Sequence, residues 1–325
     1  MVTKNYWQDR NVLITGCTGF LGGHLTKLLL DQSTNIVGLV RDRVPRADLF
    51  REALFNKITI VNGCLEDYHL LERTINEYEI ETIFHLGAQT IVRIANRNPL
   101  STFKSNIEGT WNVLEASRRN PTVRSIIMAS SDKAYGTAKK IPYDESACLN
   151  GEYPYDVSKS CADLLAKSYH KTYNLPVCVT RCGNFYGSGD LNFNRIVPGT
   201  IRSVIRNKNP IIRSDGSFIR DYFYIKNGVN AYVHLAEKMT DSKIHGEAFN
   251  FSNEQPLSVI EITNLVLQLM GREDLKPIIK NEVSKEIPEQ WLSSKKAKKL
   301  LGWKAKFSIE EGLIETIEWY KGLLE

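Results

Sequence analysis

Short apolar runs that alternate with longer segments constrain the fold of this chain more than any other feature. Six runs read as strands: NVLITG (11–16), NIVGLV (35–40), KITIVNG (57–63), TIFHLGA (82–88), RSIIMAS (124–130) and PVCVTRCGN (176–184). The segments between them have room for helices, as in GTWNVLEASRR (109–119). Strands that alternate with helices form right-handed βαβ units. The sequence therefore predicts an α/β fold with a doubly wound parallel sheet of the Rossmann type, which binds ligands at the carboxyl ends of its strands.

The regular alternation weakens after about residue 190, where GDLNFNRIVPGTIRSVIRNKNP (189–210) is rich in Asn, Arg and Pro. Two later segments, LSVIEITNLVLQLMG (257–271) and SIEEGLIETIEWYKGLL (308–324), have the apolar stripes of amphipathic helices. We expect a dinucleotide-binding-type domain of residues 1–188, joined by about 221–250. Residues 189–220 and 251–325 are expected to form a smaller C-terminal lobe.

Composition and charge narrow the class of protein. Of 325 residues, 42% are apolar and 24% are charged, which is ordinary for a globular chain long enough to bury a sizeable core. The net charge is only +5, and a solvated helix face explains SSKKAKK (293–299) better than a nucleic-acid site does. No window approaches the ~20 apolar residues of a membrane span, and the six cysteines form no C-x-x-C pair or Cys/His cluster. We expect a cytoplasmic protein that binds no metal, nucleic acid or membrane.

TGCTGFLGG (15–23) places Gly16, Gly19 and Gly22 between the first strand and the first helix. Glycine allows a tight turn, lets a pyrophosphate approach the backbone and permits close helix packing. The N-terminus of the helix then offers N–H donors to the anion. Turns collect glycine for other reasons too, but the position at the start of a βαβ series favours dinucleotide binding.

The end of the second strand leaves the cofactor open between NAD and NADP. A carboxylate there usually binds the 2′-hydroxyl of NAD, but this strand ends at Val40 and is followed by Arg41, Asp42 and Arg43. The two guanidinium groups fit the 2′-phosphate of NADP, whereas Asp42 fits a free ribose. A third interpretation is that all three are solvated loop charges.

YPYDVSK (153–159) sets Tyr155 and Lys159 four residues apart, which places both on one face of a helix. A phenol of pKa ~10 is a weak base at neutral pH, and a nearby ammonium stabilises its phenolate. The same spacing is common by chance, and a surface Tyr beside a Lys is the ordinary explanation. Downstream of a dinucleotide turn and next to the strand end at Ser131, a catalytic pair is favoured instead.

These features together resemble the extended short-chain dehydrogenase/reductase superfamily over nearly the whole chain. The resemblance rests on the glycine motif, the Tyr155/Lys159 pair, HLGAQ (85–89), NIEGTWNVLEA (106–116), SSDKAYG (130–136), RCGNFYGSGD (181–190) and LLGW (300–303). Within the superfamily the pattern is most similar to nucleotide-sugar 4,6-dehydratases. Asp132-Lys133 is similar to the pair in CDP-glucose and UDP-N-acetylglucosamine dehydratases, and departs from the Asp-Glu of dTDP-glucose dehydratases.

The resemblance implies a role for each residue of the SSDKAYG stretch. Ser131 hydrogen-bonds the sugar 4-hydroxyl and Tyr155, which takes the 4-hydroxyl proton while the C4 hydride moves to the nicotinamide. Lys133 is the implied base that removes the C5 proton, and Asp132 the implied acid that protonates the departing 6-hydroxyl. A normal lysine pKa of ~10.4 hinders that base, and burial beside other cations lowers the pKa while the adjacent Asp132 opposes this. An exposed Asp-Lys ion pair without a catalytic role is the alternative.

The resemblance also implies the binding residues. The cofactor-binding residues are Gly16, Thr18, Gly19, Phe20, Leu21, Gly22, Arg41, Asp42, Leu65, Leu86, Ala88, Gln89, Asn106, Tyr155 and Lys159. The substrate-binding residues are Gln89, Ser131, Asn184, Arg195 and Arg220, and the smaller lobe is the nucleotide-sugar lobe. Guanidinium groups suit a buried diphosphate, although each Arg has the alternative of a structural ion pair. The chain departs from the family at Gly63-Cys64, where Gly-Asp often lies near the adenine.

We expect a nucleotide-diphosphate-sugar 4,6-dehydratase that retains NAD or NADP tightly through an internally redox-neutral cycle. A UDP-N-acetylglucosamine-type sugar, or its dehydrated intermediate, is the first substrate choice and CDP-glucose the second. A 4-epimerase or 4-ketoreductase of the same fold is the alternative enzyme, and a non-catalytic dinucleotide-sensing protein is the alternative outside enzymes. By resemblance alone we also expect a homodimer that pairs through two helices of each chain, and no feature excludes a larger assembly.

Overall fold

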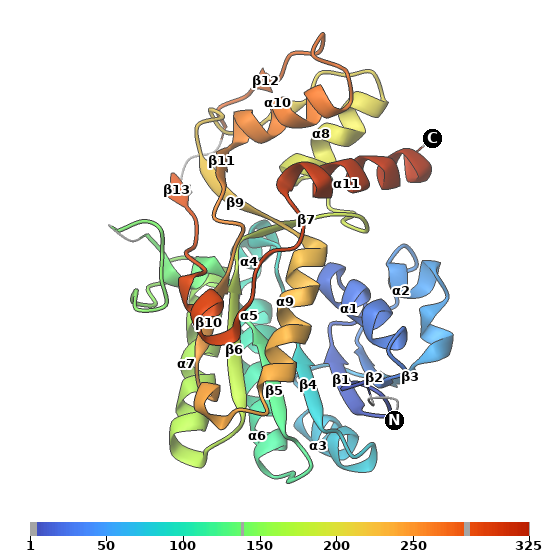
Figure 1. Cartoon of the computed structure of the whole chain (residues 1–325), viewed down its shortest axis with the longest axis vertical. Coiled ribbons are helices and arrows are strands. Elements are labelled where there is room, and N and C mark those ends of the chain that lie inside the picture. The colour runs from blue at the N-terminus through green and yellow to red at the C-terminus, as the bar shows by residue number, and fades with distance from the viewer. Residues whose placement is uncertain (1–4, 138–139, 283–286, 325) are drawn as a thin grey trace. The chain divides into compact units, whose positions relative to one another are not determined.

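The computed structural model describes residues 5–137, 140–282 and 287–324, and the chain forms two compact units (Figure 1). The first unit consists of Met1–Thr137, Glu145–Arg181 and Val229–Phe249. The second consists of Ala138–Asp144, Cys182–Gly228 and Asn250–Glu325.

A seven-stranded sheet with the order β10-β6-β5-β4-β1-β2-β3 forms the centre of the first unit. Its strands are β1 (Asn11–Thr15), β2 (Asn35–Val40), β3 (Thr59–Asn62), β4 (Thr82–His85), β5 (Ser125–Ala129), β6 (Val177–Cys182) and β10 (Ala248–Phe251). The pairs β1–β2, β1–β4, β2–β3, β4–β5 and β5–β6 are all parallel. All six strands expected from the apolar runs are confirmed, and so is the doubly wound parallel sheet. The strand order reverses between β1 and β4, which is where such sheets bind ligands.

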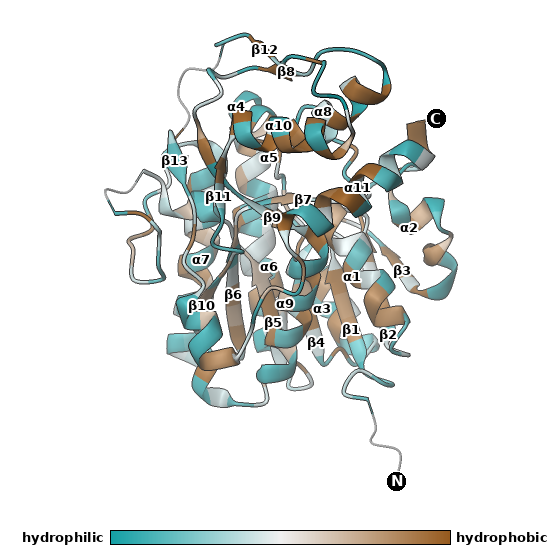
Figure 2. Ribbon diagram, turned by 45° about the horizontal axis from the view of Figure 1, so that its top comes forward, coloured by the Kyte–Doolittle hydropathy of each residue, from teal (hydrophilic) through white to brown (hydrophobic). Residues whose placement is uncertain are grey.

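Helices cover both faces of this sheet. They are α1 (Phe20–Leu30), α2 (Asp48–Arg51), α3 (Tyr68–Glu77), α4 (Val92–Arg97), α5 (Pro99–Phe103), α6 (Gly109–Arg118), α7 (Pro154–Tyr173) and α9 (Ile225–Lys238). Buried apolar residues of α3, α6 and α7 join alternate residues of the strands, such as Leu13, Ile83 and Ile126, in one core cluster. The side chains between them, including Ile14 and Phe84, are buried on the other face, where Figure 1 shows α1 and α9. Strands buried on both faces are apolar throughout, as the colouring of β1 in Figure 2 shows.

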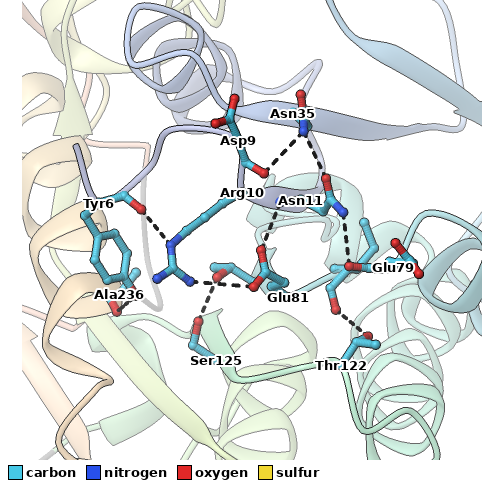
Figure 3. A network of polar contacts seen from close by, with 12 residues as sticks. Tyr6, Asp9, Arg10, Asn11, Asn35, Glu79, Glu81, Thr122, Ser125 and Ala236 are labelled. Carbon is cyan, nitrogen blue, oxygen red and sulfur yellow. Dashed lines mark hydrogen bonds and ion pairs between the residues drawn. The ribbon is translucent and has the colours of Figure 1, made fainter. Parts of the chain in front are cut away.

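Polar contacts tie together the amino ends of the strands (Figure 3). Nε of Arg10 donates to the carbonyl oxygen of Tyr6 at 2.6 Å, and the same guanidinium lies 3.9 Å from the carboxylate of Glu81. Glu81 also accepts the backbone N–H of Asn11, whose side-chain oxygen accepts from Asn35 Nδ2 at 3.1 Å. This edge of the sheet is therefore occupied by structural contacts, which leaves the carboxyl edge for chemistry.

The described part of the second unit contains a smaller sheet and, wholly within the unit, the α-helices α8, α10 and α11. Its sheet has the order β11-β9-β13, with β7 also paired to β9, and β8 pairs with β12 apart from it. The strands are β7 (Asn184–Tyr186), β8 (Ile211–Ile212), β9 (Ile219–Tyr224), β11 (Pro256–Ser258), β12 (Ile278–Ile279) and β13 (Glu289–Gln290), and the helices α8 (Ile196–Ile205), α10 (Val259–Leu269) and α11 (Ile309–Leu324). The expected amphipathic helices are α10 and α11, and both pack on α8.

The lysine-rich segment near the C-terminus is helical, and most of its lysines are exposed. Within SSKKAKK, Lys295, Lys298 and Lys299 are exposed on a helical segment, although Ala297 is buried and Lys298 pairs with Glu254. Among the described residues, no helix has the length and apolar character that crossing a membrane requires.

Candidate active site

The turn between β1 and α1 has the geometry of an anion cradle. Gly16 has φ +75°, and a Cβ there would lie 2.8 Å from the backbone nitrogen of Gly87. A Cβ at Gly22 would lie 2.1 Å from the carbonyl oxygen of Gly16, so α1 packs directly against the turn. Gly19 is the N-cap and offers no side chain to the first N–H groups of α1. Those donors remain for an anion such as a pyrophosphate, and the turn fits a dinucleotide.

The other residues of this turn differ in how deeply their side chains are buried. Thr18, Phe20 and Leu21 are all half-buried at the start of α1. Cys17 differs, because its thiol is buried and faces the carbonyl oxygen of Leu39 at 3.6 Å. Burial raises the pKa of Cys17 to about 12, so this thiol is a packing group and not a nucleophile.

The segment after β4 reaches the same edge of the sheet. The hydroxyl oxygen of Thr15 accepts the backbone N–H groups of Leu86 at 3.1 Å and Gly87 at 3.0 Å, which fixes the end of β4 beside the glycine turn. Leu65, which follows β3, is buried, and its side chain would contact a Cβ placed at Gly87. Leu86, Ala88 and Gln89 are half-buried. The expected cofactor residues of three different strands therefore lie along one edge.

Asn106 connects this edge to α7. Its Nδ2 donates to the carbonyl oxygen of Gln89 at 3.1 Å and to Ser158 Oγ at 2.9 Å, while its Oδ1 accepts the Gln89 N–H at 2.7 Å. Asn106 lies in a single π-helical turn, Lys104–Glu108, between α5 and α6. Such turns occur often at functional sites because they redirect one side chain. Ser158 in turn donates to the carbonyl oxygen of Tyr155 at 2.7 Å.

His85 was assigned no role from the sequence, although it lies within HLGAQ. The ring is buried, with Nδ1 2.9 Å from Thr15 Oγ1 and Nε2 3.1 Å from Thr110 Oγ1. Thr110 donates its own proton to the Asn106 carbonyl at 2.6 Å, so it accepts from His85, and Nε2 carries the ring proton. Burial, assisted by the charge of Lys159, lowers the pKa of His85 to about 3. A neutral histidine therefore links the glycine turn to Asn106.

Tyr155 and Lys159 lie on α7, as their spacing predicts. Tyr155 is 8% exposed, and Lys159 Nζ lies 6.0 Å from the centroid of its ring. Nζ donates to the carbonyl oxygen of Ala129, the last residue of β5, at 2.8 Å. Burial lowers the pKa of Lys159 to about 8, and the carboxylate of Asp163 opposes that effect. An ammonium fixed beside a buried phenol favours the phenolate, which a base at this position requires.

Ser131, Asp132 and Lys133 form the start of a 3₁₀ turn, Asp132–Tyr135, directly after β5. The Ser131 hydroxyl donates to Asp132 Oδ1 at 2.9 Å, and its oxygen accepts the Lys133 N–H at 3.2 Å. Asp132 is only 2% exposed and Lys133 is half-buried. The alternative of an exposed ion pair therefore does not describe Asp132, whose carboxyl is held inside the first unit.

Asp156 is a second residue that the sequence analysis left without a role. It follows Tyr155 in the first turn of α7 and is 4% exposed. Burial raises the pKa of its carboxyl to about 6, with the charge of Lys133 opposing and that of Asp132 adding to the effect. Asp156 therefore shares its electrostatic surroundings with both candidate acid–base residues. Its place inside YPYDVSK was the one feature that pointed to it.

Arg41 and Asp42, after β2, lie outside this buried cluster. Arg41 Nε contacts Asp42 Oδ2 at 2.7 Å, and both side chains are more than half exposed. The guanidinium carbon of Arg43 lies 5.5 Å from the centroid of the Phe50 ring. Cys64, at the family's usual adenine contact, is a half-buried free thiol.

Three expected substrate residues belong to the second unit. Asn184 is exposed at the start of β7. Arg195 is the N-cap of α8, and its guanidinium donates to Asp190 Oδ2 at 3.1 Å. Arg220, in β9, is 6% exposed and donates to the carbonyl oxygens of Ile219 at 2.9 Å and Pro288 at 3.2 Å. Both arginines therefore hold structural contacts within their own unit.

Comparisons with known proteins agree with this architecture. The family model described as GDP-mannose 4,6 dehydratase matches residues 13–316. The CDP-glucose 4,6-dehydratase of Salmonella typhimurium is 28% identical, and the alignment covers 99% of this chain and 93% of that protein. The human dTDP-D-glucose 4,6-dehydratase is 26% identical, with 96% and 90% covered.

Solved structures share the fold along almost the whole chain. A UDP-glucose 4-epimerase of Thermotoga maritima, solved with UDP-glucose, superimposes with a TM-score of 0.88 at 28% identity, covering 97% of this chain and 100% of that one. A dTDP-glucose 4,6-dehydratase of Bacillus anthracis, solved in complex with NAD, gives a TM-score of 0.84 at 25% identity, covering 96% and 97%.

The doubly wound sheet and its glycine-rich first turn define a dinucleotide-dependent α/β enzyme. More narrowly, the chain belongs to the NAD-dependent nucleotide-sugar dehydratase and epimerase family of the extended short-chain dehydrogenases/reductases.

Proposed function

We propose that the protein is a nucleotide-diphosphate-sugar 4,6-dehydratase that forms a 4-keto-6-deoxy sugar. The observation that carries the proposal is the buried Asp132 beside Lys133, on a turn next to the Tyr155/Lys159 helix. A 4-epimerase needs one proton-transfer residue at C4, whereas loss of water across C5 and C6 needs a second acid and base on neighbouring atoms.

The chain's own residues divide the proton transfers between them. Tyr155 takes the proton of the 4-hydroxyl, and Lys159 stabilises the phenolate that does so. Lys133 removes the C5 proton, exchanges it with solvent and later delivers a proton to C5, while Asp132 gives its proton to the 6-hydroxyl, which leaves as water. The dinucleotide, when bound, would supply the hydride acceptor for C4 and, once reduced, the hydride donor to C6. In this proposal the dinucleotide is held by Tyr155 and Lys159 together with Gly16, Thr18, Gly19, Phe20, Leu21, Gly22, Arg41, Asp42, Leu65, Leu86, Ala88, Gln89 and Asn106.

We propose a UDP-N-acetylglucosamine-type sugar, or its dehydrated intermediate, as the substrate. The proposed substrate residues are Gln89 and Ser131 of the first unit and Asn184, Arg195 and Arg220 of the second. CDP-glucose is the second candidate, which the similarity to the Salmonella enzyme of that name favours. The similarity to a UDP-glucose 4-epimerase keeps epimerisation as the alternative reaction.

The proposed cofactor is NAD, retained through the cycle. Asp42 already neutralises Arg41, and Arg43 lies against the Phe50 ring, which leaves neither guanidinium placed as a dedicated phosphate clamp. The Bacillus anthracis relative was solved with NAD. We further propose a cytoplasmic homodimer, because all six cysteines are free thiols and apolar side chains are exposed on α5, α6 and α7.

Product mass tests the reaction. Purified protein is incubated with UDP-N-acetylglucosamine, CDP-glucose, dTDP-glucose, UDP-glucose and GDP-mannose, and the products are analysed by mass spectrometry. A dehydratase gives a product lighter by one water, an epimerase leaves the mass unchanged, and a reductase consumes added NADH or NADPH.

In D₂O the dehydrated product should carry deuterium at C5, and Lys133→Met should lower its formation by at least about 100-fold. Water loss from none of these substrates would refute the proposal.

A further inference from the structure

The turn that carries Asp132 and Lys133 ends at Tyr135, whose side chain is completely buried. The backbone N–H of Gly136 donates to the carbonyl oxygen of Lys133 at 3.0 Å, which closes the turn around Tyr135. Because these residues are neighbours in one short hydrogen-bonded turn, any shift of Tyr135 also displaces Lys133 and Asp132. The position of the candidate acid–base pair therefore depends on what holds Tyr135.

A buried ion pair holds the hydroxyl of Tyr135. Arg181 Nη1 donates to the Tyr135 hydroxyl oxygen at 2.7 Å, and the guanidinium carbon lies 4.8 Å from the centroid of the Tyr135 ring. Nε and Nη2 of Arg181 donate to the two carboxylate oxygens of Asp163, at 3.1 and 2.7 Å. All three side chains are buried, and charge-assisted hydrogen bonds shielded from water are strong and well oriented. We call these three residues the Tyr135–Arg181–Asp163 triad.

The triad joins the turn to the helix that carries the other candidate catalytic pair. Asp163 lies on α7, one helical turn after Lys159, and its carboxylate acts on the Lys159 ammonium. Arg181 belongs to β6, the strand that pairs with β5. The turn after β5, helix α7 and strand β6 are therefore connected by one set of side-chain contacts within the first unit.

A second tether fastens the same turn to α7. Ser160 Oγ donates to the carbonyl oxygen of Ala134 at 2.8 Å. Ser160 directly follows Lys159 on the helix, and Ala134 directly precedes Tyr135 in the turn. The turn is thus held at two neighbouring points, by the backbone of Ala134 and by the side chain of Tyr135.

The proposed reaction uses the two fastened pairs in different steps. Tyr155 and Lys159 act while the C4 hydride moves to the dinucleotide, whereas Asp132 and Lys133 act in the subsequent loss of water across C5 and C6. Both pairs have to reach one hexose, because C4 and C5 are adjacent atoms. A displacement of about 1 Å can slow such a step on the order of 10²-fold. Loss of water therefore depends on how firmly the turn is held against α7.

We propose that Tyr135 and Arg181 are positioning residues for the loss of water. They hold Asp132 and Lys133 in place relative to the candidate catalytic pair on α7, so that both pairs reach the same hexose. Neither Tyr135 nor Arg181 touches a reacting atom in this proposal, and both act through the turn. The inference rests on the proposed function, because it requires that Asp132 and Lys133 carry out the elimination.

Conservative variants separate this role from general support of the fold. Tyr135→Phe removes the hydroxyl that accepts from Arg181 and keeps the ring that fills the core. Ser160→Ala removes the second tether. Tyr169→Phe is the matched control, because it removes a tyrosine hydroxyl on the same helix that bonds a charged side chain, Glu115. Thermal unfolding establishes that each variant is folded before its kinetics are compared.

The experiment follows the two steps separately, with enzyme in excess over the sugar nucleotide that the wild type dehydrates. The near-ultraviolet absorbance of reduced nicotinamide reports C4 oxidation, and mass spectrometry of quenched samples reports loss of water. In Tyr135→Phe, reduced nicotinamide should form within about twofold of the wild-type rate, while loss of water should slow at least about tenfold. Ser160→Ala should slow the same step by a smaller factor, and Tyr169→Phe should match the wild type in both steps.

Two results would overturn the inference. Unchanged loss of water in Tyr135→Phe means that the turn keeps its place without the hydroxyl contact. Equal slowing of both steps means that the triad supports the site as a whole and positions no particular step. If Tyr135→Phe does not fold, Ser160→Ala decides by the same criterion. If the wild type removes water from none of the sugar nucleotides, the proposed function itself fails, and that is visible before any variant is compared.

Discussion

At the scale of single residues, the buried His85 shows how a polar group can connect the parts of a site without reacting. Its two nitrogens join Thr15, at the glycine turn, to Thr110, which bonds Asn106. The ring has to remain neutral, because a proton on Nδ1 would face a hydroxyl that already accepts two backbone N–H groups. The same ring therefore carries no charge next to buried Lys159, whose own charge helps to keep it neutral.

Replacing His85 tests this linkage. His85→Ala should reduce the free energy of unfolding by about 2–4 kcal/mol at pH 7, from the cavity and the lost hydrogen bonds. The pKa of about 3 is below the unfolded value of ~6.5, so the histidine's contribution is present above pH 6.5 and is lost as pH falls toward 3. The difference between wild type and variant should shrink from pH 7 to pH 4 in urea titrations. His69→Ala, at an exposed position of α3, is the control and should change the free energy of unfolding at pH 7 by less than about 0.5 kcal/mol.

At the scale of elements, the turn between β1 and α1 offers a matched pair of glycines. A Cβ at Gly22 would lie 2.1 Å from the carbonyl oxygen of Gly16, whereas a Cβ at Gly23 would meet nothing closer than 3.8 Å. Gly22→Ala should therefore shift the turn and release the dinucleotide. Gly23→Ala should leave binding intact and stabilise the helix by up to about 1 kcal/mol.

Cofactor carried through purification measures this difference. Protein is denatured, and the released nucleotide is identified and quantified by mass spectrometry. Loss of nucleotide from Gly23→Ala but not from Gly22→Ala would contradict the geometry of the turn. The same measurement on wild type separates NAD from NADP.

A buried ion pair joins α7 to β6 and supports the turn after β5. Arg181 donates through Nε and a terminal nitrogen to both oxygens of Asp163, at 3.1 and 2.7 Å, and to the hydroxyl of Tyr135 at 2.7 Å. Arg181 and Asp163 are both nearly inaccessible to solvent. Removing one partner strands the other charge, so Asp163→Asn should cost about 3–5 kcal/mol of unfolding free energy. Glu77→Gln, which breaks the exposed Arg73–Glu77 pair, should cost less than about 0.5 kcal/mol. A loss in Asp163→Asn as small as that of Glu77→Gln would show that the buried pair is not a major support.

The sequence predicted the elements better than the contacts between them. Apolar runs and helical spacing are local features, and they located β1 to β6, α10 and α11. The surroundings of His85 and Asp156 depend on folding, because Thr110 lies 25 positions from His85 and the charges of Asp132 and Lys133 act on Asp156 from another element. The π-helical turn at Asn106 also has no local sequence mark. A single sequence therefore indicates which residues gather at the carboxyl edge, but not the hydrogen bonds that hold them there.

At the scale of the whole molecule, exposed apolar side chains of the first unit gather on neighbouring helices. Leu100 of α5 is 66% exposed, Trp111 of α6 is 43% exposed and Leu164 of α7 is 55% exposed. Both α5 and α6 pack on α7. Large apolar groups concentrated on packed helices are typical of an interface, and Trp in particular contributes strongly to association. The helix that carries Tyr155 and Lys159 is thus also one of the three helices that expose apolar side chains suited to pairing with a second copy.

Charge placed on this surface should separate the proposed homodimer. Trp111→Glu combined with Leu164→Glu puts two carboxylates where each chain would meet its partner, and burying them unpaired is unfavourable. Light scattering after gel filtration should change from the mass of two chains to the mass of one. Ile314→Glu, on α11 and 50% exposed, is the control and should keep the wild-type mass. A dimer that persists in the double variant would place the interface elsewhere, and a monomeric wild type would remove it. Because α7 also carries the proposed Tyr155/Lys159 pair, the separated chain should show lower turnover at unchanged cofactor content.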